Sequence, residues 1–258
     1  MPSKSTLKHC SKEGSNVKPE EDAVGQAMLA FYEKRKSFEV IEREDGYFEV
    51  TNTRMYFEDF EHWAEHEKKA MNWVRGRVLD IGCGAGRHSL HLQSKGLNVV
   101  AIDRSPLAIK VSQLRGVKKA KVMALEDIEF KPNAFETVLM LGGNFALLGN
   151  PKKALRVLRK LHRMTSDDAV IIAEAVDPYV TDNPAQLKYY ALNKRRGKLP
   201  GQWRIRIRFH NFVTKWFDLL HNSKKEMEEI LSDTGWTIKW FIDSGNPYIA
   251  IIEKVKKK

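Results

Sequence analysis

The chain has 258 residues, a net charge of +11 and 42% hydrophobic residues. This composition suffices for the core of one α/β domain with additions, and no apolar run approaches the roughly 20 residues of a membrane helix. The two cysteines, Cys10 in a polar tail and Cys83 in a glycine-rich segment, argue against a structural disulfide. Because the first residues also lack the apolar stretch of a secretory signal, we expect a cytoplasmic protein.

The first 74 residues are expected to precede the main domain. Residues 1–20 are polar and rich in Lys and Ser, which predicts a disordered tail. Residues 21–74 predict a helical segment that acts as a lid, with one helix near 25–36. The aromatic residues that would form the lid, unless they only pack against the next helix, are Tyr56, Phe57 and Trp63.

A glycine-rich loop follows the first strand of the main domain. The apolar run 77–81 predicts a strand, and a helical pattern begins at Arg87. Between them stand Gly82, Gly84 and Gly86, which permit a tight turn and close approach of a ligand to the backbone. A strand, a glycine-rich turn and a helix in this order are typical of sites for nucleotide-like ligands.

An acidic residue ends the second strand. The strand is predicted over 98–102, and Asp103 follows about 20 positions after the first glycine, the spacing of a carboxylate that binds ribose hydroxyls. The alternative is that Asp103 caps the helix predicted over 105–115.

Strands and helices then alternate, which predicts a doubly wound α/β fold. A seven-stranded, mostly parallel sheet with helices on both faces accounts for the pattern. Its remaining strands are expected at 121–124, 137–141, 169–175, 236–243 and 248–254, with further helices at 151–164 and 223–234.

An insertion is expected before the last helix, at about 176–221 in a main domain of 75–258. Residues 176–202 are predicted to be mostly loop. The strict alternation of Trp203–Phe209 predicts a half-buried strand, and 216–221 is a candidate partner strand. The alternate positions of this strand are arginines, at Arg204, Arg206 and Arg208.

The chain resembles the class I S-adenosylmethionine-dependent methyltransferases. The resemblance is carried by Val78-Leu-Asp-Ile-Gly-Cys-Gly-Ala-Gly86, by Val99-Val-Ala-Ile-Asp103 and, more loosely, by Leu125-Glu-Asp-Ile128 and Phe135–Leu141. It implies S-adenosylmethionine as cofactor and a transferase activity. The cofactor-binding residues that it implies are Asp80, Gly82, Cys83, Gly84, Gly86, Asp103, Arg104, Glu126, Asp127, Ile128 and Leu141.

Within this set the resemblance implies distinct contacts. Asp80 would face the amino-acid end of the cofactor and Asp103 the ribose. Asp127 would accept a hydrogen bond from the adenine amine, with Ile128 packed on the ring. An NAD-linked oxidoreductase is an alternative, but the third glycine comes too early for the dinucleotide fingerprint.

The sequence shows no catalytic signature, so the catalytic residues are unassigned. Methyl transfer needs mainly positioning and exclusion of water, and a base only where the acceptor must lose a proton early. Weak candidates at the expected ligand-binding edge or beside the inserted strand are Asn144, Asp177 and His210. The pair His62 and His66 has zinc-like spacing but no supporting ligands, so we expect no metal.

The acceptor is expected to be a small molecule. The loop after the fourth strand reads Gly142-Gly-Asn-Phe145, which lacks the element typical of base N-methyltransferases, and no RNA-binding module is recognisable. One arginine of 203–209 is expected to hold an acidic acceptor in a pocket. The alternative is an RNA or protein methyltransferase acting through the basic surface.

Overall fold

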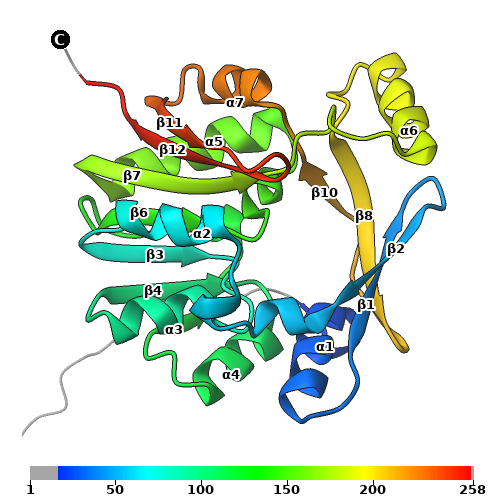
Figure 1. The fold of residues 1–258 in the computed structure, drawn as a ribbon, viewed down its shortest axis with the longest axis horizontal. Coiled ribbons are helices and arrows are strands. Elements are labelled where there is room, and N and C mark those ends of the chain that lie inside the picture. Colours follow the sequence, from blue (N-terminus) through cyan, green and yellow to red (C-terminus); the bar gives the residue numbers. More distant parts are fainter. Residues whose placement is uncertain (1–16, 257–258) are drawn as a thin grey trace, which may run out of the picture.

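The computed structural model describes residues 17–256, which form two β-sheets, with helices on both faces of the larger one (Figure 1). The first is a seven-stranded sheet in the order β11-β12-β7-β6-β3-β4-β5. The five strands from β7 to the edge strand β5 are parallel, and β12 and β11 complete the sheet on the other side as an antiparallel pair. The strands are β3 (Arg77–Ile81), β4 (Asn98–Asp103), β5 (Ala120–Val122), β6 (Phe135–Met140), β7 (Thr165–Ala175), β11 (Trp236–Ile242) and β12 (Tyr248–Lys254). The predicted fold class is confirmed.

Helices cover both faces of the seven-stranded sheet, as expected for strands that read as continuous apolar runs. Ala70 and Leu92 pack with one face, whereas Leu158 and Met227 belong to the core on the other. The helices of the first face are α2 (Glu65–Ala70), α3 (Arg87–Ser94) and α4 (Pro106–Leu114), and those of the second are α5 (Pro151–Met164) and α7 (Lys224–Leu231). The short 3-10 helices are η1 (Pro19–Glu21), η2 (Thr53–Tyr56), η3 (Phe60–His62), η4 (Met71–Trp73), η5 (Leu125–Asp127) and η6 (Asn144–Leu148).

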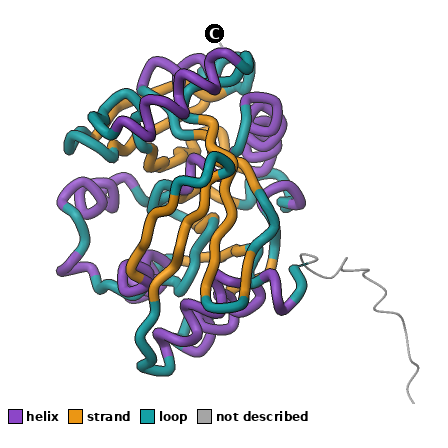
Figure 2. The backbone as a smooth tube through the Cα atoms, turned by 90° about the vertical axis from the view of Figure 1, so that its right-hand side faces the viewer, coloured by secondary structure: helices purple, strands orange, loops and turns teal. Residues whose placement is uncertain are grey.

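The second is a five-stranded antiparallel sheet, which faces the viewer in Figure 2. It has the order β10-β8-β1-β2, with β9 paired to β8. The strands are β1 (Phe38–Arg43), β2 (Phe48–Asn52), β8 (Gln202–Phe209), β9 (Phe212–Val213) and β10 (Phe217–Leu220). The inserted strand and its partner are thus confirmed, but their neighbour in the sheet comes from the N-terminal segment.

The N-terminal segment is not only helical, which corrects the prediction for residues 21–74. It begins with α1 (Ala23–Tyr32), capped by Asp22, but continues as the β1–β2 hairpin. Apolar and polar residues alternate only over short stretches of this hairpin, where Phe38 and Phe48 are exposed and Glu39 is buried, and pairing with β8 stabilises it as strand. Of the expected tail, residues 1–16 lie outside the described residues, while η1 occupies Pro19–Glu21.

The segment 176–202 contains a helix that the sequence interpretation missed, α6 (Pro184–Arg195). Pro184 counts as a loop signal in the sequence, but it occupies the first turn of this helix, where proline is well tolerated. Tyr189 packs α6 against Trp203 and Ile205 of the five-stranded sheet. None of the helices within residues 17–256 has the length and apolar content required to cross a membrane.

Candidate functional site

The glycine-rich loop connects β3 to α3 at the carboxyl edge of the seven-stranded sheet. Gly82 and Gly84 both have positive φ, 69° and 53°. A Cβ atom on Gly82 would lie 2.6 Å from Nδ2 of Asn144, so a side chain there would force the two loops apart. The sequence therefore needs glycine in this turn for both conformation and space.

Asp103 holds the glycine-rich loop in place. Its Oδ2 accepts a hydrogen bond from the Gly84 N–H at 3.0 Å, and its Oδ1 accepts one from the Ser105 N–H at 2.9 Å. Burial raises the pKa of the Asp103 carboxyl, while these two N–H donors lower it. The cap of α4 is the hydroxyl of Ser105, which accepts from the Ala108 N–H, so Asp103 is not the cap of that helix.

Asn144 crosses from the loop after β6 to the glycine-rich loop. Its Nδ2 donates to the carbonyl oxygens of Ile81 and Gly82, at 3.0 and 2.9 Å. Asn144 is therefore more than a turn residue, because it ties two loops together at the edge where the strands end. From the sequence, Asn144 is predicted only as a weak catalytic candidate.

A cavity of about 640 Å³ opens beside these loops. This volume lies within the range of small-molecule sites. On its rim, Glu126 pairs with Lys153 at 2.5 Å. Burial raises the pKa of the Glu126 carboxyl, but the Lys153 hydrogen bond, a backbone hydrogen bond and the charges of Lys153 and Arg104 together lower it, and the net shift is downward. The residues predicted from the sequence that line the cavity are Gly82, Gly84, Asp103, Arg104, Glu126 and Asn144.

Other residues expected to contact a cofactor do not line the cavity. Asp80 is 2% exposed and its Oδ2 accepts from the Ser89 hydroxyl at 2.6 Å, so it joins β3 to α3 beneath the loop. Ile128 and Leu141 lie in the two hydrophobic cores on opposite faces of the sheet. The predicted residues that lie off the lining are Asp80, Cys83, Gly86, Asp127, Ile128 and Leu141.

Two of the catalytic candidates also lie away from the cavity. Asp177 organises the loop after β7: its N–H donates to Asn246 Oδ1, and its Oδ1 accepts from the Tyr179 N–H. His210 is exposed in the turn between β8 and β9, where its ring contacts Phe209. Asp177 was expected at the ligand-binding edge and His210 beside the inserted strand, and neither lines the cavity.

The five-stranded sheet supplies the wall opposite the glycine-rich loop. Ile41 of β1 and the pair Ile205 and Ile207 of β8 line the cavity with apolar side chains. The alternation of 203–209 predicted an apolar face for β8, although not what it faces. Ile41 was missed because its strand carries no alternation that sequence reasoning could detect.

The arginines of β8 are paired with carboxylates. Glu42 accepts from both Arg206 and Arg208, at 2.7 and 2.5 Å, and the Arg206 guanidinium in particular lowers the pKa of Glu42 to about 2. Arg204 pairs with Asp218 at 3.1 Å, and this last pair lies on the cavity lining.

The aromatic residues of the N-terminal segment lie in three different surroundings. Tyr56 lines the cavity. Phe57 instead packs on Phe31, with ring centroids 4.7 Å apart, and Trp63 packs edge-on against His88 of α3.

The histidine pair with zinc-like spacing, His62 and His66, does not form part of a metal site. His66 lies 3.8 Å from Glu174, and within residues 17–256 no three His, Cys, Asp or Glu side chains are grouped to hold a metal.

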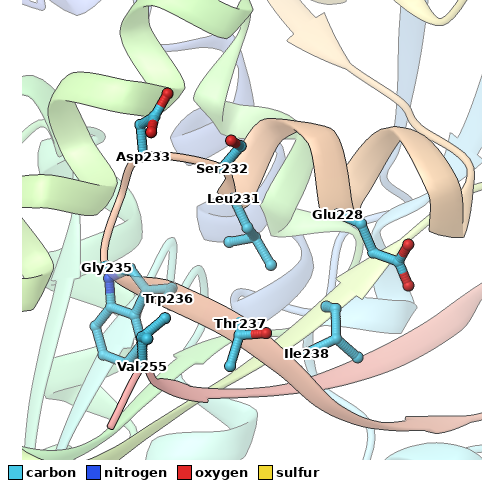
Figure 3. A pocket seen from close by; sticks show the side chains of 9 residues that line it. All are labelled: Glu228, Leu231, Ser232, Asp233, Gly235, Trp236, Thr237, Ile238 and Val255. Atoms are coloured by element: carbon cyan, nitrogen blue, oxygen red, sulfur yellow. The ribbon is translucent and has the colours of Figure 1, made fainter. Parts of the chain in front are cut away.

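A second cavity, of about 560 Å³, lies where α7 ends and β11 begins (Figure 3). Its wall includes Trp236 and the carboxylates of Glu228 and Asp233. None of the residues predicted to bind a cofactor or to act in catalysis belongs to it.

Comparisons with known proteins agree with the glycine-rich loop and the fold. Residues 78–168 match a family described as methyltransferase domain. The chain is 25% identical to a solved SAM-dependent methyltransferase from Bacteroides fragilis, in complex with S-adenosyl-L-homocysteine; the match covers 95% of this chain and all of that one, with a TM-score of 0.80. A methyltransferase from Methanosarcina mazei shares the fold, at 20% identity and a TM-score of 0.57 over 72% of this chain and 97% of that one.

The fold and the loop thus define an α/β protein of the nucleotide-binding type. Residues 78–168 form a methyltransferase domain, and the chain as a whole is similar to S-adenosylmethionine-dependent methyltransferases of class I, whose cofactor is S-adenosylmethionine.

Two curated relatives match only part of the chain. The chain is 42% identical over 57 residues to the ubiquinone biosynthesis O-methyltransferase of Xylella fastidiosa, which is 20% of this chain and 23% of that protein. It is 27% identical over 113 residues to a human ATP synthase lysine N-methyltransferase, which is 42% of this chain and 46% of that protein. The chain thus spans from about a quarter to about half of the length of these relatives.

Proposed function

We propose that the chain transfers a methyl group from S-adenosylmethionine to a small-molecule acceptor. The observation that carries the proposal is the cavity itself, which lies between the glycine-rich loop of one sheet and the apolar face of the other. A site enclosed in this way suits a small ligand. The partial match to ubiquinone biosynthesis O-methyltransferases favours a hydroxyl acceptor with an apolar body.

The edge of the seven-stranded sheet would hold the methyl donor. Gly82 and Gly84 let the donor approach the backbone closely, and the Asp103 carboxylate retains lone pairs to accept from ribose hydroxyls. Glu126, which lines the cavity, replaces Asp127 as the better candidate for the adenine end. These residues fit the family's cofactor, since a Cβ atom on Gly82 would lie 2.6 Å from Asn144 Nδ2 and glycine alone leaves this turn free.

The five-stranded sheet would hold the acceptor. Ile41, Ile205 and Ile207 offer an apolar surface, and the Arg204–Asp218 pair offers charge at its margin. When bound, S-adenosylmethionine supplies an electrophilic methyl group for in-line displacement. The chain's own residues would orient the acceptor and exclude water, which accounts for a site without a strong catalytic signature.

Donor binding is the direct test of this proposal. Calorimetry should detect binding of S-adenosylmethionine and S-adenosylhomocysteine, and no comparable binding of NADH. Tight binding of NADH without binding of either sulfur compound would overturn the proposal.

The runner-up is a methyltransferase for RNA or protein, which the net charge of +11 and the lysine N-methyltransferase match favour. Against it, the arginines of β8 are engaged with Glu42 and Asp218. Filter binding to total RNA across a salt series separates the two, because phosphate contacts make affinity fall steeply with salt. Submicromolar affinity at physiological salt, lost on replacing the three arginines, would favour the runner-up.

A further inference from the structure

A buried carboxyl group stands behind the wall of the main cavity. Glu39 of β1 is 1% exposed. Its Oε2 accepts a hydrogen bond from the Tyr56 hydroxyl at 3.1 Å, and its Oε1 has no hydrogen-bond partner among the described residues. Burying a carboxyl with one oxygen unsatisfied costs stability, so its presence needs a reason beyond packing.

Tyr56 connects this carboxyl to the glycine-rich loop. The Tyr56 ring lies close to Gly84: a Cβ atom added to Gly84 would be 3.6 Å from Tyr56 Cδ1. Both residues line the cavity. The Tyr56 phenol also interacts electrostatically with both Glu39 and Asp103. Two residues along β1, on the same face as Glu39, Ile41 lines the cavity as well.

Within residues 17–256, no basic side chain forms an ion pair with Glu39. Burial raises the pKa of the Glu39 carboxyl to about 7, and the Tyr56 hydrogen bond offsets this in part. Helix α1 carries no charged side chain, β2 presents Thr51 opposite Glu39, and the arginines of β8 pair with Glu42 or Asp218. The basic residues that line the cavity are Arg104, Lys153, Arg204 and Lys215, and none of them is among the groups that shift the pKa of Glu39. A positive charge bound beside Tyr56 would therefore stabilise the carboxylate form of Glu39.

We propose that Glu39, acting through Tyr56, is a positioning residue that favours the charged methyl donor over its uncharged product. This inference rests on the proposed function, since it takes the cavity as the donor site. S-adenosylmethionine carries a sulfonium cation, whereas S-adenosylhomocysteine has a neutral thioether at the same atom. A cation in the cavity favours the carboxylate form of Glu39, so donor binding releases a proton that product binding does not.

Calorimetry measures this linkage without a known acceptor. S-adenosylmethionine and S-adenosylhomocysteine are titrated into the protein between pH 6 and 8, in buffers that differ in ionisation enthalpy. If the donor lowers the pKa of Glu39 by about one unit, about half a proton is released near pH 6.5. The affinity ratio of donor to product then rises roughly five-fold from pH 6 to 8.

Variants assign the proton to Glu39. Glu39→Gln keeps an acceptor for Tyr56 but cannot titrate, so the proton release and the pH dependence of the ratio should disappear. Tyr56→Phe, which removes the connecting hydroxyl, should reduce both. Glu49→Gln, an exposed position on β2 of the same sheet, is the matched control and should behave as the unchanged protein.

The outcomes separate this inference from the proposed function. Binding of both ligands with equal proton release, or release that persists in Glu39→Gln, overturns the role of Glu39 alone. Absence of binding by either ligand overturns the proposed function and this inference with it.

Discussion

The two sheets of this protein are built in different ways. The five parallel strands of the seven-stranded sheet lie within residues 77–175, and their side chains are buried between helices on both faces. The five-stranded sheet joins segments far apart in sequence: Glu42 and Arg206, which pair across β1 and β8, are 164 residues apart. One of its faces lines the cavity, and the arginines on β8 form ion pairs.

The two sheets therefore contribute differently: the seven-stranded sheet carries the hydrophobic core, and the five-stranded sheet lines the cavity with side chains. The parallel strands present backbone groups and loops at their carboxyl edge, which is where ligands bind in open α/β sheets. The five-stranded sheet contributes side chains to the cavity, so its residues can change with the acceptor. We therefore expect substitutions in the first sheet to affect stability and donor binding, and those in the second to affect ligand preference.

The largest expected effect is on the core of the seven-stranded sheet. Leu139 of β6 is fully buried, so Leu139→Ala should lower the free energy of unfolding by about 2–5 kcal/mol. Ile207→Ala, on the half-buried wall of the cavity, should cost about 1 kcal/mol because solvent already reaches it. Urea denaturation measures both. Equal losses would show that the two sheets contribute alike to the core.

Glu39→Gln in the five-stranded sheet should change how the stability of the protein depends on pH. A carboxyl whose pKa is raised from 4.5 to about 7 binds more protons in the folded state, so folding loses stability as pH rises from 4.5 and the penalty is complete above 7. That penalty is on the order of 3 kcal/mol. Glu39→Gln should therefore be more stable than the unchanged protein at pH 8 and about equal below pH 4.5. Parallel stability curves across this range would contradict the buried titration.

Asp103→Ala tests the donor side of the cavity. It removes a candidate ribose ligand and two hydrogen bonds that hold the glycine-rich loop, so donor binding should weaken by about 1–3 kcal/mol. Calorimetry with S-adenosylhomocysteine measures the loss. Asp167→Ala, an exposed carboxylate on β7, serves as the control. Unchanged affinity in Asp103→Ala would remove Asp103 from the donor site.

The smallest expected effect concerns the ion pairs of the five-stranded sheet. Arg206→Ala should change stability by no more than about 1 kcal/mol, because the pair is partly solvated. Since the pKa of Glu42 is lowered from 4.5 to about 2, the contribution is present above pH 4.5 and is lost as pH falls toward 2. Thermal unfolding at pH 7 and pH 3 checks the sign. A larger loss at pH 3 than at pH 7 would contradict it.

Local patterns in the sequence predicted the parts of the site that lie on one βαβ unit. Gly82, Gly84 and Asp103 lie on the cavity because the turn after β3 and the end of β4 are neighbours in a parallel sheet. The Arg-bearing strand and its partner were also predicted, since alternation is a local property. Helix α6 was missed because Pro184 signals a loop as readily as it starts a helix.

The residues that lie opposite the glycine-rich loop could not be predicted from the sequence, because they depend on contacts between distant segments. No local pattern links β1 to β8, so the isoleucine wall, Tyr56 and the buried Glu39 depended on a pairing between distant segments. The same holds for Asp80 and Ile128, whose motif positions suggested ligand contact but whose side chains point into the packing. The identity and spacing of residues in the sequence determine which chemical groups a site can contain. The burial of those groups and their hydrogen-bond partners depend on which distant segments pack against them.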